Sequence, residues 1–397
     1  MNYPLPELVK PYAGQIMDTD AHEATPLNFW REQFGSVVDE FVDAIGQSKL
    51  GANAVSEGDL TPITAETVFH VKRDKAPGAF DFKRRVEVLD FTGVNRQLMF
   101  PGGMGLLSAA FLSSCDTSGQ LFSTISGDRK GYAVRLVKAY NDWCGRVAAE
   151  SDRLRPVAIL IGDTVDDLVA EAKRLLDMGV RGFWFPSDTP PAGLSPAALA
   201  LDPLWALLAD ADAPALAHTG SDERFYGTLA WRKAEAFEGW KAGEEFSLDP
   251  WTLCNMHLAT QNFLVSMVMG GVFERHPRLR YGACEVTAQW IGTATDNMDM
   301  WHGHSRIFSQ LGGASPLKKK PSEYVRSNVR VSCFEFEDVG AYINRYGMPE
   351  VYCYASDYPH PEGGKTPIEN FADCLSGQPE EVRRQFFVTN GELLMPD

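Results

Sequence analysis

Short apolar stretches alternate with helical patterns along most of the chain, and this alternation limits the folds open to it. Apolar positions recur at helical spacing over about 132–151, and the apolar stretch 155–161 follows. Repeated strand–helix units are typical of parallel α/β folds. Eight stretches are candidate strands: 16–22, 97–101, 155–161, 180–185, 215–218, 280–285, 329–333 and 351–355. Eight units favour a closed (β/α)8 TIM barrel over an open sheet.

Two segments interrupt the alternation, at about 28–82 and 219–255, and we interpret them as lid-like insertions into one domain spanning 1–397. A chain of this length, with 44% hydrophobic residues, can bury one large core. The second insertion is rich in aromatic residues, which could wall a bulky apolar substrate or form a subunit interface. These residues are Phe225, Tyr226, Trp231, Phe237, Trp240, Phe246 and Trp251.

Charge and cysteine usage indicate the kind of partner. The formal net charge is -16, which argues against nucleic acid or an anionic membrane and favours small molecules. The seven cysteines are scattered and lack C-x-x-C spacing, as expected for reduced thiols. We find no export signal and no apolar stretch long enough to cross a membrane. We therefore expect a cytoplasmic protein that binds a small molecule, with homo-oligomer formation left open.

The first candidate strand ends in a cluster of polar residues, Asp18-Thr-Asp-Ala-His-Glu23. Side chains alternate along a strand, so Asp18, Asp20 and His22 are expected to share one side. This pattern predicts oxygen and nitrogen ligands at a strand end. An acidic turn that caps the next segment is the other interpretation.

Later strands end in further residues of metal-binding type, namely His218, Glu285 and Asp357. In a (β/α)8 barrel the active site lies at the C-terminal ends of the strands. Each residue also has a structural interpretation: His218 as a polar loop residue, Glu285 as a partner of a helix N-terminus, and Asp357 as a turn residue. Their joint placement at strand ends favours a metal site.

The other histidines carry weaker signals. His257 begins an amphipathic helix, where pocket lining or capping is as good an interpretation as metal binding. His360 follows Asp357 in a proline-flanked loop, and we interpret it as a residue that supports the site or the loop. The remaining histidines are interpreted as ordinary loop or surface residues: His70, His276, His302 and His304.

Together these segments resemble the second amidohydrolase family, metal-dependent (β/α)8 barrels that include hydrolases and decarboxylases of aromatic and unsaturated acids. The matching segments are Asp18–His22, His218–Gly220, Gly271–Leu279 leading to Glu285, Lys320–Tyr324 and Ala355–Gly363. The resemblance implies that Asp20, His22, His218 and Asp357 are metal ligands. It also places His257 and Glu285 where many relatives carry a histidine and an acidic residue.

Two departures from the family pattern bear on the metal. Better-known relatives have His-x-His in the first strand, whereas this chain has Asp20-x-His22. The harder oxygen ligand favours Mn or Fe(II), while Zn stays open. Several relatives carry Glu just before the proline, where this chain has Thr25 before Pro26, so the role of Glu23 is left open.

The resemblance implies hydrolysis or nonoxidative decarboxylation of a small aromatic or unsaturated acid. Asp357 would orient or deprotonate a water molecule, and His257 would move the proton. The alternative is a non-haem dinuclear iron monooxygenase, because the superfamily contains one that acts on a diterpenoid CoA ester. Six protein ligands are too many for one catalytic ion with an open coordination position, but they suit two ions. The six are Asp20, His22, His218, His257, Glu285 and Asp357. We therefore expect one or two divalent ions of Zn, Mn or Fe. A barrel without chemistry is a third interpretation, which the intact ligand set opposes.

Overall fold

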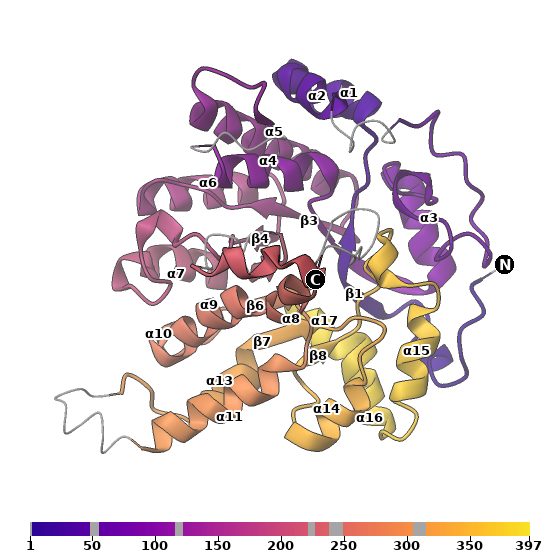
Figure 1. The fold of residues 1–397 in the computed structure, drawn as a ribbon. Helices are drawn as coiled ribbons and strands as arrows, with labels where there is room; N and C mark the ends of the chain where they lie inside the picture. Colours follow the sequence, from indigo (N-terminus) through magenta and orange to yellow (C-terminus); the bar gives the residue numbers. More distant parts are fainter. Residues whose placement is uncertain (1, 48–54, 116–121, 221–226, 238–248, 305–314) are drawn as a thin grey trace.

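The computed structural model describes residues 2–47, 55–115, 122–220, 227–237, 249–304 and 315–397. Eight parallel strands follow one another in chain order within a single sheet, and helices surround them (Figure 1). The strands are β1 Ile16–His22, β2 Val94–Phe100, β3 Leu154–Ile159, β4 Gly182–Trp184, β5 Ala215–His218, β6 Tyr281–Cys284, β7 Val329–Ser332 and β8 Tyr352–Cys353. Each overlaps a predicted stretch, so the predicted (β/α)8 barrel is confirmed.

Backbone hydrogen bonds join the first strand to the segment that follows the last one. The His22 amide donates to the Tyr358 carbonyl over 2.7 Å, and the Asp357 amide donates to the Asp20 carbonyl over 2.8 Å. The two chain segments that carry Asp20, His22 and Asp357 therefore lie side by side, although they are far apart in the sequence.

The helices follow the strands as the alternation predicts. Those of the first half are α1 Trp30–Phe34, α2 Asp39–Gly46, α3 Phe82–Thr92, α4 Gly103–Ser113, α5 Arg129–Glu150, α6 Val165–Asp177 and α7 Asp202–Asp210. Those of the second half are α8 Pro250–Asn255, α9 Leu258–Met269, α10 Val272–Arg275, α11 Trp290–Gly303, α13 Pro321–Asn328, α14 Val339–Tyr346, α15 Pro367–Cys374, α16 Glu380–Arg384 and α17 Asn390–Leu394. Within the described ranges, no helix is long and apolar enough to cross a membrane.

Local sequence fixes the ends of α6. Thr164, its N-cap, forms a capping box with Asp167, in which each side chain accepts a hydrogen bond from the other residue's amide. The helix ends at Asp177, and Gly179 follows with a φ of +92°, a left-handed conformation that favours glycine.

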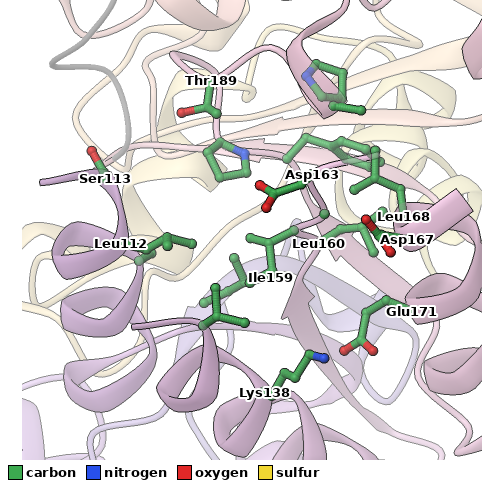
Figure 2. Close-up of a pocket in the computed structure, with 18 of the residues that line it drawn as sticks. Leu112, Ser113, Lys138, Ile159, Leu160, Asp163, Asp167, Leu168, Glu171 and Thr189 are labelled. Atoms are coloured by element: carbon green, nitrogen blue, oxygen red, sulfur yellow. The ribbon is translucent and has the colours of Figure 1, made fainter. Parts of the chain in front are cut away.

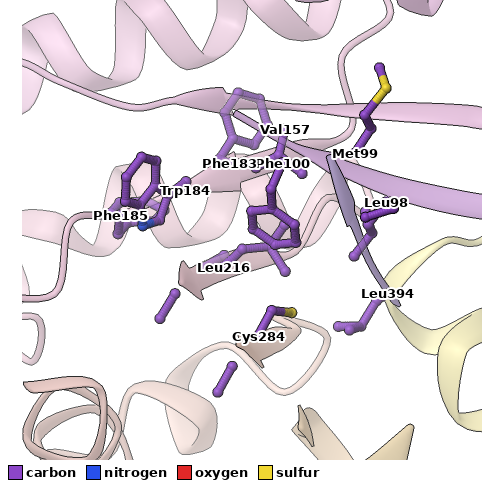
Figure 3. Packing of buried hydrophobic residues seen from close by; sticks show 14 of the residues in the cluster. Leu98, Met99, Phe100, Val157, Phe183, Trp184, Phe185, Leu216, Cys284 and Leu394 are labelled. Carbon is purple, nitrogen blue, oxygen red and sulfur yellow. The ribbon is translucent and has the colours of Figure 1, made fainter. Parts of the chain in front are cut away.

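Buried apolar side chains of neighbouring strands pack together (Figure 3), and two glycines make room for Leu216 of β5. A Cβ atom at Gly182 would lie 3.3 Å from the Leu216 side chain, and one at Gly282 only 2.6 Å from it. Leu394 of α17 packs against the same position, 3.1 Å from a Cβ atom at Gly282. The end of the chain thus packs against β6.

The first insertion is partly helical and packs on the barrel's helices. Phe34 of α1 contacts Trp143 of α5, and Phe41 of α2 contacts Phe111 of α4, with ring centroids 5.9 and 6.0 Å apart. Further along the insertion, the Arg73 amide donates to the Pro359 carbonyl over 2.8 Å, next to the loop after β8. The lid role of this insertion and the single-domain organisation stay predictions.

The second insertion, 219–255, is described only in part. Its predicted aromatic residues Phe225, Tyr226, Trp240 and Phe246 lie outside the described residues. Trp231 is 67% exposed. Whether the aromatic residues line a substrate or a subunit interface therefore stays a prediction.

Candidate metal centre

Five of the six predicted ligand residues come together where the strands end. Asp20 and His22 lie in β1, His218 ends β5, Glu285 follows β6, and Asp357 lies in the turn after β8. Their ligand atoms, together with one of His360, form two overlapping groups, in each of which all atoms lie within 4.8 Å of one another. The first group is Asp20, His22, His218 and Glu285, and the second is His22, Glu285, Asp357 and His360.

Imidazole and carboxylate atoms face one another at short range in this cluster. Glu285 Oε2 lies 2.9 Å from His218 Nε2 and 3.3 Å from His22 Nε2. Asp20 Oδ1 lies 3.6 Å from His218 Nε2 and 3.7 Å from His22 Nε2. His22 Nε2 is also 3.5 Å from Asp357 Oδ1. Glu285 therefore lies between the two histidines.

Several of these atoms are buried without a hydrogen-bond partner in the described part of the chain. They are the Nε2 atoms of His22 and His218, Asp20 Oδ1 and both carboxylate oxygens of Asp357. A buried polar atom without a partner is costly and uncommon. Each is an electron-pair donor when the imidazoles are neutral, so one or two cations bound among them would satisfy them. The donor set fits a divalent metal ion.

Backbone carbonyl groups set the orientation of both imidazoles. His22 Nδ1 lies 3.1 Å from the Pro101 carbonyl oxygen, and His218 Nδ1 lies 2.9 Å from that of Thr219. A carbonyl can only accept, so the proton of each neutral ring belongs on Nδ1. The lone pair on Nε2 then points at the cluster, which is the arrangement that metal-binding histidines use.

The backbone is strained at two of the ligand positions. Glu285 has a φ of +51° and Asp357 a φ of +49°, a left-handed conformation that is rare for residues other than glycine. Hydrogen bonds hold both turns, since the Glu285 amide donates to Ser332 Oγ over 3.1 Å and the Asp357 amide donates to Asp20. Strain of this kind is concentrated at functional sites.

The buried carboxylates of the cluster favour a positive charge among them. Burial raises the pKa of Asp20, and burial together with the charge of Glu285 raises the pKa of Asp357 well above its usual range. Burial lowers the pKa of His22 to about 3. Burial also acts to lower the pKa of His218, but the charges of Glu285 and Asp20 outweigh it and raise that pKa. A proton on His218 thus supplies positive charge that a metal ion would replace.

Three other residues considered from the sequence lie apart from the two ligand groups. His257 makes no cap hydrogen bond, and its ring stacks on Trp290 with centroids 6.2 Å apart. Asp18 is in neither group, and its carboxylate accepts hydrogen bonds from Gln97 and Ser356. In the pairing of β1 with β2, a register shift separates Asp18 from Ala21.

Glu23, whose role the sequence left open, belongs to neither ligand group. Its carboxylate accepts hydrogen bonds from the Thr25 amide and hydroxyl, at 2.8 and 2.6 Å, and from the Gly102 amide at 3.1 Å. Glu23 therefore holds the chain after β1 against the chain after β2.

Sequence reasoning underrated His360. Its ring stacks on that of His22, with centroids 3.8 Å apart and an interplanar angle of 16°, and its Nδ1 lies 3.4 Å from Asp357 Oδ1. The spacing of three residues from Asp357 was the available signal. Ser332 was missed entirely, because a serine near the end of a strand carries no signal of its own.

A cavity of about 680 Å³ lies elsewhere, between α4, α5, α6 and the chain after β4 (Figure 2). The described residues that line it include no member of either ligand group. Four of its charged residues form ion pairs, Lys130 with Asp163 at 2.9 Å and Arg174 with Glu171 at 2.8 Å. The chemistry is therefore assigned to the strand ends and not to this cavity.

Solved structures share the fold over nearly the full length of the chain. An amidohydrolase from Mycobacterium avium subsp. paratuberculosis is 19% identical, with a TM-score of 0.65, over 96% of this chain and 99% of its own. A 5-carboxyvanillate decarboxylase from Novosphingobium aromaticivorans, complexed with manganese and 4-hydroxy-3-methoxy-5-nitrobenzoic acid, is 17% identical, with a TM-score of 0.60, over 96% of both chains. A dihydroxybenzoic acid decarboxylase from Polaromonas sp. JS666, with bound manganese and 2-nitroresorcinol, is 14% identical, with a TM-score of 0.56, over 96% of both chains.

These likenesses establish the fold. No curated protein matches the chain in sequence. The family model for amidohydrolases matches residues 123–393, which is well over half of the chain and includes His218, Glu285 and Asp357. The barrel, the cluster of metal-binding side chains at its strand ends and this match lead to one conclusion: the chain belongs to the amidohydrolase family of metal-dependent enzymes.

Proposed function

We propose that the protein catalyses nonoxidative decarboxylation of a small aromatic or unsaturated acid with a divalent metal ion. Hydrolysis of a small organic acid derivative is the other reaction open to the same site. The observation that carries the proposal is the convergence of buried, unpartnered donor atoms from Asp20, His22, His218 and Asp357 at the strand ends. Two structures of similar fold are named as decarboxylases and hold manganese with an aromatic ligand, which supports this substrate class.

Asp20, His22, His218 and Asp357 would hold the ion, with Glu285 beside both histidines. A bound ion would supply Lewis acidity to the oxygens of the substrate acid. The chain's own part is to keep the donors in place before substrate arrives. The carbonyls of Pro101 and Thr219 do this for the imidazoles, and Ser332 does it for the Glu285 turn.

Asp357 is the group that we assign to proton movement. Without a metal ion, burial and the charge of Glu285 raise its pKa, so this carboxyl group accepts a proton more readily than an exposed aspartate. Neither of its oxygens has a hydrogen-bond partner among the described residues, so one oxygen can bind the ion while the other is available to a water molecule or a substrate. His257, the second proton carrier suggested by the sequence, stays a prediction.

The test begins with protein purified without added metal. We expect about one divalent ion per chain by elemental analysis. Under nitrogen, 5-carboxyvanillate and 2,6-dihydroxybenzoate are the first compounds to assay, with released CO2 and the arene product measured together. The Asp357→Asn variant should lose turnover. Turnover that persists after complete removal of metal would contradict the proposal.

The two overlapping ligand groups favour a second candidate, oxygen-dependent hydroxylation of a bulky apolar substrate at two iron ions. His22 and Glu285 belong to both groups, so the Glu285 carboxylate could serve two ions. His218 belongs only to the first group and His360 only to the second.

This division gives a matched pair of variants. If two ions bind, His218→Ala and His360→Ala should each lower the stoichiometry from about two towards one. If one ion binds in the first group, only His218→Ala should lower it. Two irons per chain with substrate-dependent O2 uptake would replace the decarboxylase proposal. One Mn or Zn with anaerobic turnover would exclude the oxygenase.

A further inference from the structure

Arg85 of α3 is an unusual residue because its charge is fully buried. Its exposed fraction is 0%, and Arg330 at 8% is the other buried cationic side chain among the described residues. Arg85 forms no ion pair with a described carboxylate. A buried charge without a counterion is costly unless its N–H groups all find acceptors. The acceptors of Arg85 therefore indicate what the residue does.

Four acceptors come from three different parts of the chain. Nε donates to the Gly78 carbonyl over 2.6 Å, and Nη1 donates to Gln97 Oε1 over 2.9 Å. Nη2 donates to the His22 carbonyl over 2.8 Å and to the Ala79 carbonyl over 3.4 Å. The guanidinium also lies over the ring of Tyr358, 4.8 Å from its centroid. Arg85 thus joins the first insertion, β2, β1 and the loop after β8.

The bond to Gln97 continues towards Asp357. Gln97 Nε2 donates to Asp18 Oδ2 over 2.7 Å. Asp18 in turn accepts from the Ser356 amide over 2.9 Å and from the Ser356 hydroxyl over 2.5 Å. Ser356 immediately precedes Asp357. A continuous path of hydrogen bonds therefore runs from the guanidinium to the residue beside a predicted ligand.

The insertion is shaped to cover this arginine. Gly78 has a φ of +72°, and a Cβ atom there would lie 2.8 Å from the Arg85 backbone. The carbonyl of Pro77, the residue before Gly78, accepts a hydrogen bond from the Tyr358 hydroxyl. The close approach at Gly78 brings its carbonyl to Arg85 Nε and seals the guanidinium beneath the loop that carries Asp357.

We propose that Arg85 is a positioning residue of the metal centre. It fixes His22 directly, through the carbonyl of that residue, and Asp357 indirectly, through Gln97, Asp18 and Ser356. The inference rests on the proposed metal-dependent function, because it assumes that His22 and Asp357 bind an ion. Groups that orient ligands in this way typically change metal affinity by about 10- to 100-fold when they are removed.

The test compares Arg85→Met with Arg330→Met. Arg330 is a matched control because it is also buried and donates to carbonyls, those of Arg326 and Val329, without contacting a ligand residue. Mn²⁺ affinity is measured by titration of the metal-free protein, the Mn²⁺ environment by electron paramagnetic resonance, and stability by thermal unfolding. Both variants should lower stability. Arg85→Met alone should weaken Mn²⁺ binding at least about tenfold and alter the spectrum.

Two further variants keep the inference falsifiable if Arg85→Met does not fold. Arg85→Lys keeps a charge and a donor, and should recover part of the affinity. Gln97→Met cuts the path to Asp18 but leaves the bonds to Gly78 and His22, and should weaken Mn²⁺ binding less than Arg85→Met.

Unchanged affinity and spectrum in the folded Arg85 and Gln97 variants would show that Arg85 is merely structural. Wild-type protein that binds no Mn²⁺, Zn²⁺ or Fe²⁺ would instead overturn the proposed function, and this inference with it.

Discussion

The two ends of the neighbouring strands β5 and β6 show opposite kinds of packing. At the level of Leu216, the space beside Gly282 is filled by the Leu216 and Leu394 side chains. Two residues further along β5, His218 presents an unpartnered nitrogen to Glu285, whose backbone is left-handed. One end of these strands stabilises the barrel, while the other holds unsatisfied atoms in strained turns. Stability and chemistry are therefore separated along the same strands, as is typical of (β/α)8 barrels.

The largest effect is expected when a ligand residue is removed from the strand ends that carry the metal-binding side chains. His218→Ala should abolish metal binding and reduce turnover to background, since the first ligand group loses its only ligand from β5. The metal-free variant should also be less stable than the metal-free wild type, because Glu285 and Asp20 lose the positive charge of His218 and the missing ring leaves a cavity beside Phe100. Elemental analysis and thermal unfolding check the two statements. Full metal occupancy in the variant would show that the site is assigned wrongly.

A cavity at the packed end should lower the stability of the barrel and leave metal binding unchanged. Leu394→Ala should lower the free energy of unfolding by about 2–5 kcal/mol, because Leu394 is buried against Gly282. Urea denaturation of the metal-free protein measures this loss. Metal stoichiometry of the folded variant should stay at the wild-type value. A parallel loss of metal affinity would show that the two ends are coupled.

Asp18 lies in β1 close to the ligand residues, and its titration should make the stability of the protein depend on pH. Burial raises its pKa from 3.8 to about 6, so the folded protein binds this proton more tightly than the unfolded chain does. Its contribution to stability is therefore fully present below about pH 4 and is lost as the pH rises through about 6, a change of about 2–3 kcal/mol. Metal-free Asp18→Asn should lose this part of the pH dependence in denaturation curves at pH 4, 5, 6 and 7. A slope identical to that of the wild type would contradict the assignment.

The smallest effect is expected at His257. Its ring stacks on Trp290 and lies outside both ligand groups, so His257→Ala should leave metal stoichiometry unchanged. Loss of the stacking should cost about 0.5–1.5 kcal/mol of stability. Both statements are checked on one preparation, the first by metal analysis and the second by urea denaturation. A missing metal ion in this variant would return His257 to the ligand set.

The sequence predicts best those features, such as the strands, that depend on local patterns of residues. The strands are apolar stretches, and the barrel rule then brings residues as distant as Asp20 and Asp357 to one end. The role of His360 depends on the left-handed turn at Asp357, which returns the imidazole to stack on His22. No periodicity encodes that turn.

Arg85 was missed for a different reason. A charged residue in a helical pattern is normally interpreted as part of a solvated face. Its burial results from the first insertion, whose residue Gly78 covers it, and this is a contact between segments that no local pattern contains. Asp18 belongs to neither ligand group, because its carboxylate accepts hydrogen bonds from Gln97 and Ser356.

The pairing of the first strand with the segment after the last one has a consequence for biogenesis. Asp20 and His22 are synthesised with the first strand of the barrel, whereas Asp357 is synthesised only after the eighth. A nascent chain that ends before β8 has His22 and His218 but lacks Asp357 and His360, so its second ligand group is incomplete. Contacts of such long sequence separation form late and slowly. Binding of an ion that needs Asp357 should therefore follow the synthesis of β8 and mark the pairing of the first strand with the segment after the last.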